Sequence, residues 1–445
     1  METIKVNFDN ITGTIKAMHS VNNGPAGSRG RSNFDLYADA HIPYARLHDS
    51  SLCSAYGGHH IVDVLKIFTN FDADPTDPAN YDFTLTDLYL KNIIDAGTKP
   101  FYRLGSSIEH WAKKYEIMPP KDFKKWAVIC EHIIKHYTEG WADGFNYDIE
   151  YWEIWNEPDT GYKENNSPTW GGTMDEFFEF FKICLFHLKG KFPHLKIGGP
   201  ALCSVTDSID IFEDMMKYLT EGERAPLDFF SWHMYGSSPK EFERKIKVVD
   251  DMLNKYGYGD AESILNEWNY VKDWANLLES YNIIKGLKGS AYIASAMCEC
   301  QRCGLDHLMY YDARPTPWNG MFDSPSFNAF KGYYSFPMFN KLYELKNEVE
   351  CKSLSDMVYA CAAKDGNEAA IMLSYFNEED ETAPCEVGID ISGFTGENGV
   401  KVTYRILDNE RDNEIFREEY FMGDRVIPRI KIDNYSTVLI GLEKA

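Results

Sequence analysis

The sequence predicts an α/β protein in which a (β/α)8 barrel is followed by an all-β, sandwich-like domain. Two observations lead to this prediction. Short apolar runs with strand character recur along the first part of the chain, and helical patterns lie between several of them. From about residue 349 onward, short alternating strands with turn residues replace this pattern. Alternating strands and helices form parallel sheets with crossover helices, and eight such units close into a barrel.

Eight barrel strands are expected, and most of them are followed by a helix. The strands lie at residues 16–22, 43–49, 99–104, 151–156, 196–200, 228–235, 263–268 and 307–312. Helical patterns cover residues 86–96, 121–137, 174–189 and 241–255. An open doubly wound sheet is the alternative fold, and it usually carries a glycine-rich phosphate turn after its first strand. Here the first strand runs into Asn22-Asn23-Gly24-Pro25, which favours the barrel.

The C-terminal part reads as a small β-sandwich. Its strands are expected at residues 357–363, 369–375, 385–391, 400–407 and 437–442. Residues 364–367, with the sequence Lys-Asp-Gly-Asn, are typical of a hairpin turn. The opening strand, residues 4–8, precedes the barrel and is expected to pair with this domain. We therefore expect an N-terminal strand (1–11), a barrel (12–340) and a β-domain (341–445).

Net charge and hydropathy disfavour some classes of binding partner. The formal net charge of −24 disfavours nucleic acid and anionic membrane surfaces, which bind positive faces. No apolar run approaches the roughly 20 residues of a membrane helix. The first six residues lack the features of a signal peptide, so we expect a cytoplasmic protein unless an N-terminal signal was trimmed. The oligomeric state stays open, a homo-oligomer included.

Cysteine usage points to buried, reduced thiols and away from a metal cluster. Ten cysteines are scattered along the chain. Cys298, Cys300 and Cys303 are close in sequence, but on the helix expected there their side chains do not converge on one point. No metal and no cofactor are therefore expected.

The stretch from Tyr151 to Asp159 reads as a buried strand that ends in a carboxylate. Apolar residues and two tryptophans form the strand, Pro158 ends it, and Glu157 is left at its carboxyl end. Burial beside aromatic surface raises the pKa of a carboxyl group. A carboxylic acid that keeps its proton near neutral pH can act as a general acid.

A second apolar strand also carries a glutamate near its carboxyl end. Residues 263–268 form another apolar strand, and Glu267 lies near its end. A single glutamate at a strand end is usually a solvated loop residue. Two such glutamates, on the fourth and seventh strands of one barrel, face each other across its mouth and suit the cleavage of a glycosidic bond. The 15% aromatic content agrees with a sugar site, although most rings fill the core.

Other strand ends add candidates for substrate binding. Weaker candidates are Arg103 on the third strand and His59 and His60 in a loop over the mouth. An arginine on the second strand would hold a nearby carboxylate ionised, or else form a structural ion pair. The candidate substrate-binding residues are Asn156, Arg46, His48, Asp49, His233, Tyr235, Trp268, Tyr311 and Trp318.

The run Trp152-Glu153-Ile154-Trp155-Asn156-Glu157-Pro158 closely resembles the acid/base motif of glycoside hydrolase family 39. That family holds β-xylosidases and α-L-iduronidases and belongs to a clan of retaining (β/α)8 glycosidases. The resemblance implies that Glu157 is the acid/base, Glu267 the nucleophile and Asn156 the residue that touches the sugar 2-hydroxyl. It also implies that a tyrosine near Tyr235 bonds the nucleophile. Asn266 departs from the threonine usual at its position.

We therefore expect a retaining exo-glycosidase that acts on short oligosaccharides, a β-xylosidase first. α-L-Arabinofuranosidase, β-glucosidase, β-galactosidase and α-L-iduronidase activities remain alternatives. A non-catalytic carbohydrate-binding protein on the same fold is the rival from another class, and the presence of both glutamates speaks against it. A metal-dependent barrel hydrolase would need more histidines at strand ends than His48 and His233.

Overall fold

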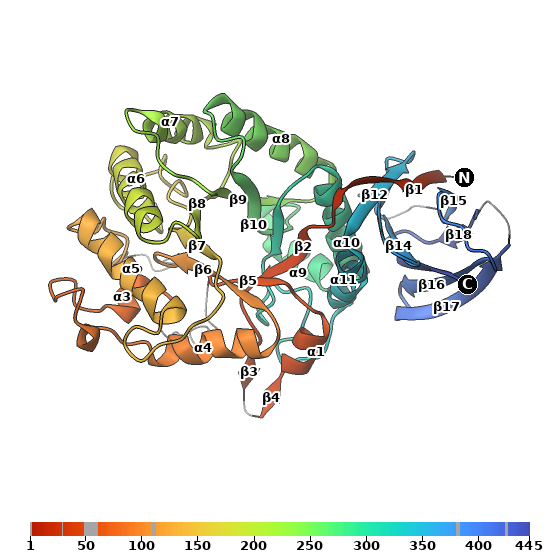
Figure 1. Ribbon diagram of the computed structural model, residues 1–445, viewed down its shortest axis with the longest axis horizontal. Coiled ribbons are helices and arrows are strands. Elements are labelled where there is room, and N and C mark those ends of the chain that lie inside the picture. The colour runs from red at the N-terminus through yellow and green to blue at the C-terminus, as the bar shows by residue number, and fades with distance from the viewer. Residues whose placement is uncertain (1, 29, 49–60, 109–112, 380–382, 423–425) are drawn as a thin grey trace.

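The chain folds into a closed barrel ringed by helices and, beside it, a strongly curved β-sheet (Figure 1). A computed structural model describes residues 2–28, 30–48, 61–108, 113–379, 383–422 and 426–445. Asp49, His59 and His60 lie outside these described residues. Both chain termini lie at the β-sheet, on the side away from the barrel (Figure 1).

Eight parallel strands close the barrel, which confirms the predicted fold class. In order around the barrel they are β2 (Ala17–Asn22), β5 (Tyr44–Arg46), β6 (Lys99–Leu104), β7 (Tyr151–Ile154), β8 (Lys196–Leu202), β9 (Phe229–Gly236), β10 (Glu262–Tyr270) and β11 (His307–Tyr310). Each predicted strand range overlaps one of them, although β8, β9 and β10 extend beyond the predicted ranges. A two-stranded ribbon, β3 (Gly27–Ser28) with β4 (Arg31–Ser32), projects from the loop after β2.

Helices cover the outside of the barrel. They are α1 (Phe34–Asp39), α3 (Val64–Ile67), α4 (Thr84–Asp95), α5 (Phe123–Thr138), α6 (Met174–Lys191), α7 (Ile209–Thr220), α8 (Lys240–Lys255), α9 (Leu277–Ile284), α10 (Leu287–Arg302) and α11 (Ser335–Leu345). Single turns of 3-10 helix occur at Pro78–Asn80, Trp274–Asn276 (η2) and Lys331–Tyr334. No described helix is both long enough and apolar enough to cross a membrane.

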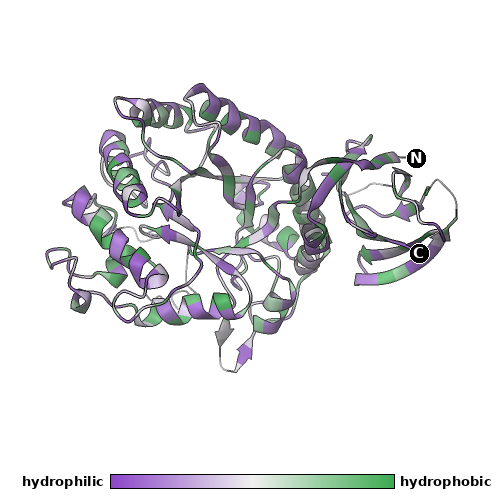
Figure 2. Cartoon of the chain, in the orientation of Figure 1, coloured by the Kyte–Doolittle hydropathy of each residue, from purple (hydrophilic) through white to green (hydrophobic). Residues whose placement is uncertain are grey.

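Local sequence explains where these helices begin and which face they bury. Thr173 and Glu176 form a capping box at the start of α6, since each side chain bonds the other residue's backbone N–H. In α8, Phe242, Ile246 and Val249 recur at helical spacing and are buried, while the other face is charged. Figure 2 shows this alternation of hydrophobic and hydrophilic residues along the helices.

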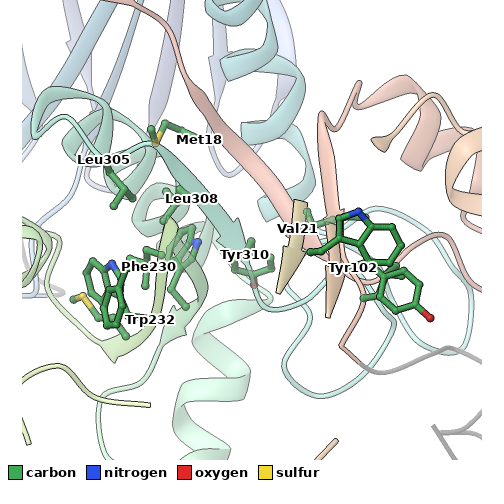
Figure 3. Close-up of a cluster of buried hydrophobic side chains, with 14 of the residues drawn as sticks. Met18, Val21, Tyr102, Phe230, Trp232, Leu305, Leu308 and Tyr310 are labelled. Atoms are coloured by element: carbon green, nitrogen blue, oxygen red, sulfur yellow. The ribbon is translucent and has the colours of Figure 1, made fainter. Parts of the chain in front are cut away.

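The main hydrophobic core fills the layer between the strands and the helices. Figure 3 shows part of it, where Met18, Val21, Trp232, Leu308 and Tyr310 gather from several barrel strands. All five are fully buried. Their strands are thereby held in fixed positions, and the residues that alternate with them along each strand point into the barrel.

The barrel interior is built in layers. At the amino ends of the strands lies an apolar layer that includes Phe101, Tyr151 and Phe229. Two residues further along their strands, Glu153 and Ser231 belong to a polar layer above it. A barrel interior filled by layers from alternate strands is the expected packing of this fold, and here polarity rises toward the carboxyl ends.

The second unit is one nine-stranded sheet rather than two separate sheets. Its order is β17 (Asp412–Phe421), β16 (Val400–Leu407), β19 (Thr437–Lys444), β14 (Glu368–Tyr375), β13 (Val358–Asp365), β12 (Asn347–Ser353), β1 (Glu2–Thr14), β15 (Cys385–Ser392) and β18 (Arg429–Ile432). Val387 of β15 and Val402 of β16 share one hydrophobic core although five strands separate them in the sheet. The sheet therefore folds over on itself and achieves the packing of a sandwich.

Three strands of this sheet, β12, β17 and β18, had no counterpart in the strands expected from the sequence. β1 pairs antiparallel with β12 and parallel with β15. The boundaries drawn from the sequence after residues 11 and 340 stay a prediction of where one unit ends and the next begins.

Candidate active site

Glu157 follows β7 on a tightly constrained turn. The backbone takes left-handed conformations at Trp155 (φ 78°) and Glu157 (φ 46°), which non-glycine residues rarely adopt. Neighbouring strand ends hold this turn in place, because Trp155 N donates to Leu104 O at 2.6 Å and Glu157 N donates to Ala201 O at 3.0 Å. The side chain of Glu157 is thereby fixed over the barrel axis, almost wholly buried.

Gly105 makes this arrangement possible from the neighbouring strand. Its φ of +154° is one that other residues rarely adopt, and a Cβ at this position would lie 2.9 Å from Trp155 Cα. A side chain at residue 105 would therefore push the end of β7 away and move Glu157.

Glu267 reaches the site through an irregularity in β10. Leu265 pairs with Trp232 of β9, but the next pair is Glu267 with His233, so Asn266 is an extra residue in β10. As a result two consecutive side chains point into the barrel. Asn266 donates to Glu153, and Glu267 accepts from Tyr235.

The two glutamates meet across the barrel mouth with His233 between them. One carboxylate oxygen of each glutamate and one ring nitrogen of His233 all lie within 4.8 Å of one another. His233 Nδ1 is 2.7 Å from Glu157 Oε1 and 3.7 Å from Glu267 Oε2. Thr160 Oγ1 donates to Glu157 Oε2 at 3.1 Å.

Glu267 has partners that favour its charged form. Tyr235 OH donates to Glu267 Oε1 at 2.6 Å, and Arg46 Nη1 lies 3.3 Å from Oε2. Burial raises the pKa of Glu267, while the charge of Arg46 and the Tyr235 hydrogen bond act in the opposite direction. Burial disfavours the charged form of His233 as well and lowers its pKa to about 4, so this imidazole is neutral at pH 7.

Arg46 joins the glutamates to a third buried carboxylate that sequence reasoning missed. Its Nε donates to Glu153 Oε2 at 2.7 Å and its Nη2 to Asn156 Oδ1 at 2.6 Å. Ser231 Oγ also donates to Glu153, at 2.6 Å. The signal was present in the sequence: a carboxylate inside a strand buried on both faces must have a partner, and the strand arginines Arg46 and Arg103 were the candidates.

Asn156 has one half of its amide engaged and one half available. Its oxygen accepts from Arg46, whereas its Nδ2, although buried, bonds no other residue in the described part of the chain. A buried amide N–H without a partner is rare in native proteins and suits a ligand oxygen.

The group formed by Glu157, His233 and Glu267 also has the spacing of a metal site. However, each carboxylate already accepts hydrogen bonds, and the Arg46 guanidinium beside Glu267 would repel a cation. Two carboxylates and a neutral imidazole in this setting suit proton transfer and nucleophilic attack better than metal coordination.

The remaining predicted residues fall into different places. The rings of His48 and Tyr311 are 5.7 Å apart, and Trp318 packs edge-on against Tyr235 at 5.5 Å, so these rings line the same mouth. Arg103 bonds Asp63 at 2.7 Å, fully buried below the mouth. Asp49 lies outside the described residues.

The prediction for Trp268 is wrong. Its ring lies in the layer between strands and helices, packed against Phe242, Tyr292 and Tyr310. The ring is fully buried in this layer, on the side of β10 that faces away from the barrel interior. The extra residue in β10 turns Glu267 inward, and the next side chain then faces outward.

A parallel eight-stranded barrel with paired glutamates at the carboxyl-end parts of its fourth and seventh strands defines a class of carbohydrate-active barrel. Comparison with known families places the chain within that class. Residues 48–276 match the family described as glycosyl hydrolases family 39, and the chain belongs to this family.

Relatives and solved structures agree with this placement. A β-xylosidase from Geobacillus stearothermophilus is 27% identical over 222 residues, which are 45% of this chain and 41% of that protein, so the match spans less than half of the relative. A glucosidase structure from Croceicoccus marinus matches with a TM-score of 0.79 at 21% identity, covering 100% of this chain and 99% of that one. A monomeric β-xylosidase from Caulobacter crescentus CB15 matches with a TM-score of 0.74 at 15% identity, covering both chains fully (100% and 100%). At these identities the structural likeness shows the fold alone.

Proposed function

We propose that this chain is a retaining exo-glycoside hydrolase of short oligosaccharides, and specifically a β-xylosidase. The observation that carries the proposal is the meeting of Glu157 and Glu267, with oxygens within 4.8 Å, across the mouth of the barrel. Retaining glycosidases hold their two carboxyl groups about 5–5.5 Å apart, whereas inverting enzymes leave about 6.5–9.5 Å for a water molecule. The short separation supports double displacement.

Glu267 is the proposed nucleophile. In the first step its carboxylate attacks the anomeric carbon and the bond to the leaving oxygen breaks, which leaves a glycosyl ester on Glu267. Arg46 and Tyr235 support this role because both stabilise the carboxylate before attack and orient its two oxygens.

Glu157 is the proposed acid/base. It gives a proton to the leaving oxygen in the first step and takes one from water in the second. His233 is neutral, so its Nδ1 can accept from the protonated Glu157 or donate to the ionised one, depending on the tautomer. With its proton on Nδ1, the neutral imidazole donates to Glu157 Oε1 in both protonation states of Glu157 and needs no change of tautomer between the two steps.

The proposal that the sugar is xylose rests on a relative and on one hydrogen-bond donor in the site. The curated relative from Geobacillus stearothermophilus is a β-xylosidase, and the Nδ2 of Asn156 offers a donor for a sugar hydroxyl beside Glu157. Because a glucosidase shares the fold, β-glucosidase activity is the second candidate.

The test is a panel of p-nitrophenyl glycosides: β-xyloside, β-glucoside, β-galactoside, α-L-arabinofuranoside and α-L-iduronide. We expect the highest kcat/KM for the β-xyloside, and proton NMR of the first product should show the β-anomer. An α-anomer formed first would exclude double displacement. If the panel stays uncleaved while xylose or xylobiose binds, the chain is a carbohydrate-binding protein on this fold.

A further inference from the structure

An exposed tryptophan stands at the mouth beside the proposed nucleophile. Trp274 lies in η2, just after β10, and 60% of its surface is exposed. Its ring is 5.3 Å from the ring of Tyr235 and 6.0 Å from that of Trp318. Trp318 in turn packs against Tyr281 at 4.9 Å. These four rings, Tyr235, Trp274, Tyr281 and Trp318, form what we call the aromatic wall.

The loop that carries Trp274 does not depend on its ring. Asp273 Oδ1 caps the turn by accepting from Ala275 N at 2.8 Å, and Lys272 N donates to Ser280 Oγ at 3.1 Å. Lys272 also pairs with Glu279 at 2.7 Å. Since polar contacts fix the backbone, the exposed ring stabilises little, and its apolar surface is available for a ligand.

The aromatic wall is attached to the nucleophile through Tyr235. The Tyr235 hydroxyl bonds Glu267 at 2.6 Å, and its ring contacts both Trp274 and Trp318. In double displacement the nucleophile and the leaving group lie on opposite sides of the anomeric carbon. The leaving group therefore departs beside Glu157, and the wall beside Glu267 faces the sugar that stays behind.

We propose that Trp274, together with Trp318, is a stacking platform for the glycone, the sugar ring that becomes attached to Glu267, and that this glycone is uncharged. The inference rests on the proposed function and extends it to a residue that determines specificity. Flat rings bind the apolar face of a pyranose, whereas a uronate would need a cation. Lys272, the cation beside Trp274 on the loop, is paired with Glu279, and the adjacent Asp273 is acidic.

The experiment compares three variants by steady-state kinetics: Trp274→Ala, Trp274→Phe and, as the matched control, Leu278→Ala. Leu278 is also apolar, is 69% exposed and lies close by in the chain, in the first turn of α9. The substrates are p-nitrophenyl β-xyloside and xylobiose, which share a glycone and differ in leaving group. Xylose serves as a competitive inhibitor that reports glycone binding alone.

We expect Trp274→Ala to raise KM for both substrates, and the inhibition constant of xylose, by a common factor of about 3 to 10. Trp274→Phe should recover part of the loss, and Leu278→Ala should match the unmodified protein. A loss confined to xylobiose would place Trp274 on the leaving-group side and overturn the proposal. Equal values for Trp274→Ala and Leu278→Ala would also overturn it.

Binding measurements separate this inference from the proposed function. If the unmodified protein cleaves none of the glycosides, the proposed function fails. Calorimetric titration with xylose and with glucuronate would then still test the platform. Weaker xylose binding in Trp274→Ala supports it, and binding of either sugar that is unchanged by Trp274→Ala, or a preference for glucuronate, contradicts it.

Discussion

The two ends of the barrel carry nearly the same set of side chains and differ in what those side chains can do. At the carboxyl end, two glutamates meet a histidine, a tyrosine and a cation: Glu157, Glu267, His233, Tyr235 and Arg46. At the amino end, Glu150 and Glu262 likewise meet His307, Tyr151 and Lys196. Residue types alone therefore do not distinguish a candidate active site from a structural cluster.

Burial and pairing distinguish the two ends. Lys196 lies 3.2 Å from Glu150 and 2.5 Å from Glu262, and the two glutamate side chains are 35% and 26% exposed. Water and one flexible lysine satisfy these charges. Glu157 and Glu267 are 6% and 5% exposed, and Arg46, the cation 3.3 Å from Glu267, also pairs with Glu153. Lys196 and solvent compensate the charges of Glu150 and Glu262 at the amino end. The buried pair at the carboxyl end has less compensation, which is typical of a functional site.

Removing one glutamate from each end should give the largest contrast. We expect Glu267→Ala to lower kcat by roughly four or more orders of magnitude, as is usual when a catalytic nucleophile is removed. Added azide should restore turnover and yield the inverted glycosyl azide. Glu262→Ala should keep kcat. A 2-fluoro glycoside that labelled any carboxylate other than Glu267 would contradict the assignment.

Glu157→Gln should separate substrates by their leaving group. Disaccharides need a proton on the departing oxygen and should lose about two to four orders of magnitude in rate. A dinitrophenyl glycoside needs none, so its first step should persist and give a burst of dinitrophenol equal to the enzyme concentration. Equal slowing of both substrates, without a burst, would make Glu157 a binding residue.

Stability should respond differently at the two ends. Glu153→Gln leaves Arg46 buried with one partner fewer and should cost about 3–5 kcal/mol in the free energy of unfolding. Glu262→Gln breaks a partly exposed pair and should cost about 1 kcal/mol or less. Urea denaturation followed by tryptophan fluorescence compares them. Similar costs would mean that burial does not separate the two clusters.

The two histidines should share a pH dependence of stability but not of activity. Burial lowers the pKa of His307, like that of His233, to about 4. Between pH 6.5 and 4 the unfolded chain binds the proton and the folded one does not. Stability is therefore lost as pH falls through this window, by about 3 kcal/mol per histidine.

His307→Asn should flatten that dependence while leaving the shape of the pH–rate profile unchanged. His233→Asn should alter both. A His307→Asn profile that shifted together with the stability curve would place the amino end within the catalytic machinery.

The sequence was sufficient to predict the barrel and the convergence of Glu157 and Glu267. The spacing of apolar strands predicts the barrel, and residues at the carboxyl ends of parallel barrel strands meet at one mouth. It was insufficient where one residue changes the register. The extra residue in β10 is invisible in an apolar run, and it decides which of Glu267 and Trp268 faces the barrel interior, because neighbours on a strand point to opposite faces. Glu153 was read as part of a buried strand, since its partner Arg46 lies 107 positions away.

Two of the three strands missed in the β-domain share a physical cause of their own. β17 and β18 are the two edges of the nine-stranded sheet, and edge strands tolerate the charged residues that hide strand character.

The place of β1 has a consequence for how the chain is made. Its partners, β12 and β15, are synthesised only after the entire barrel. During translation β1 must therefore wait, with unpaired backbone groups, while more than three hundred residues emerge and fold. The β-sheet can close only after β19 has been made, so β1 is made before the barrel and finds its partners in the sheet only after the barrel strands are complete.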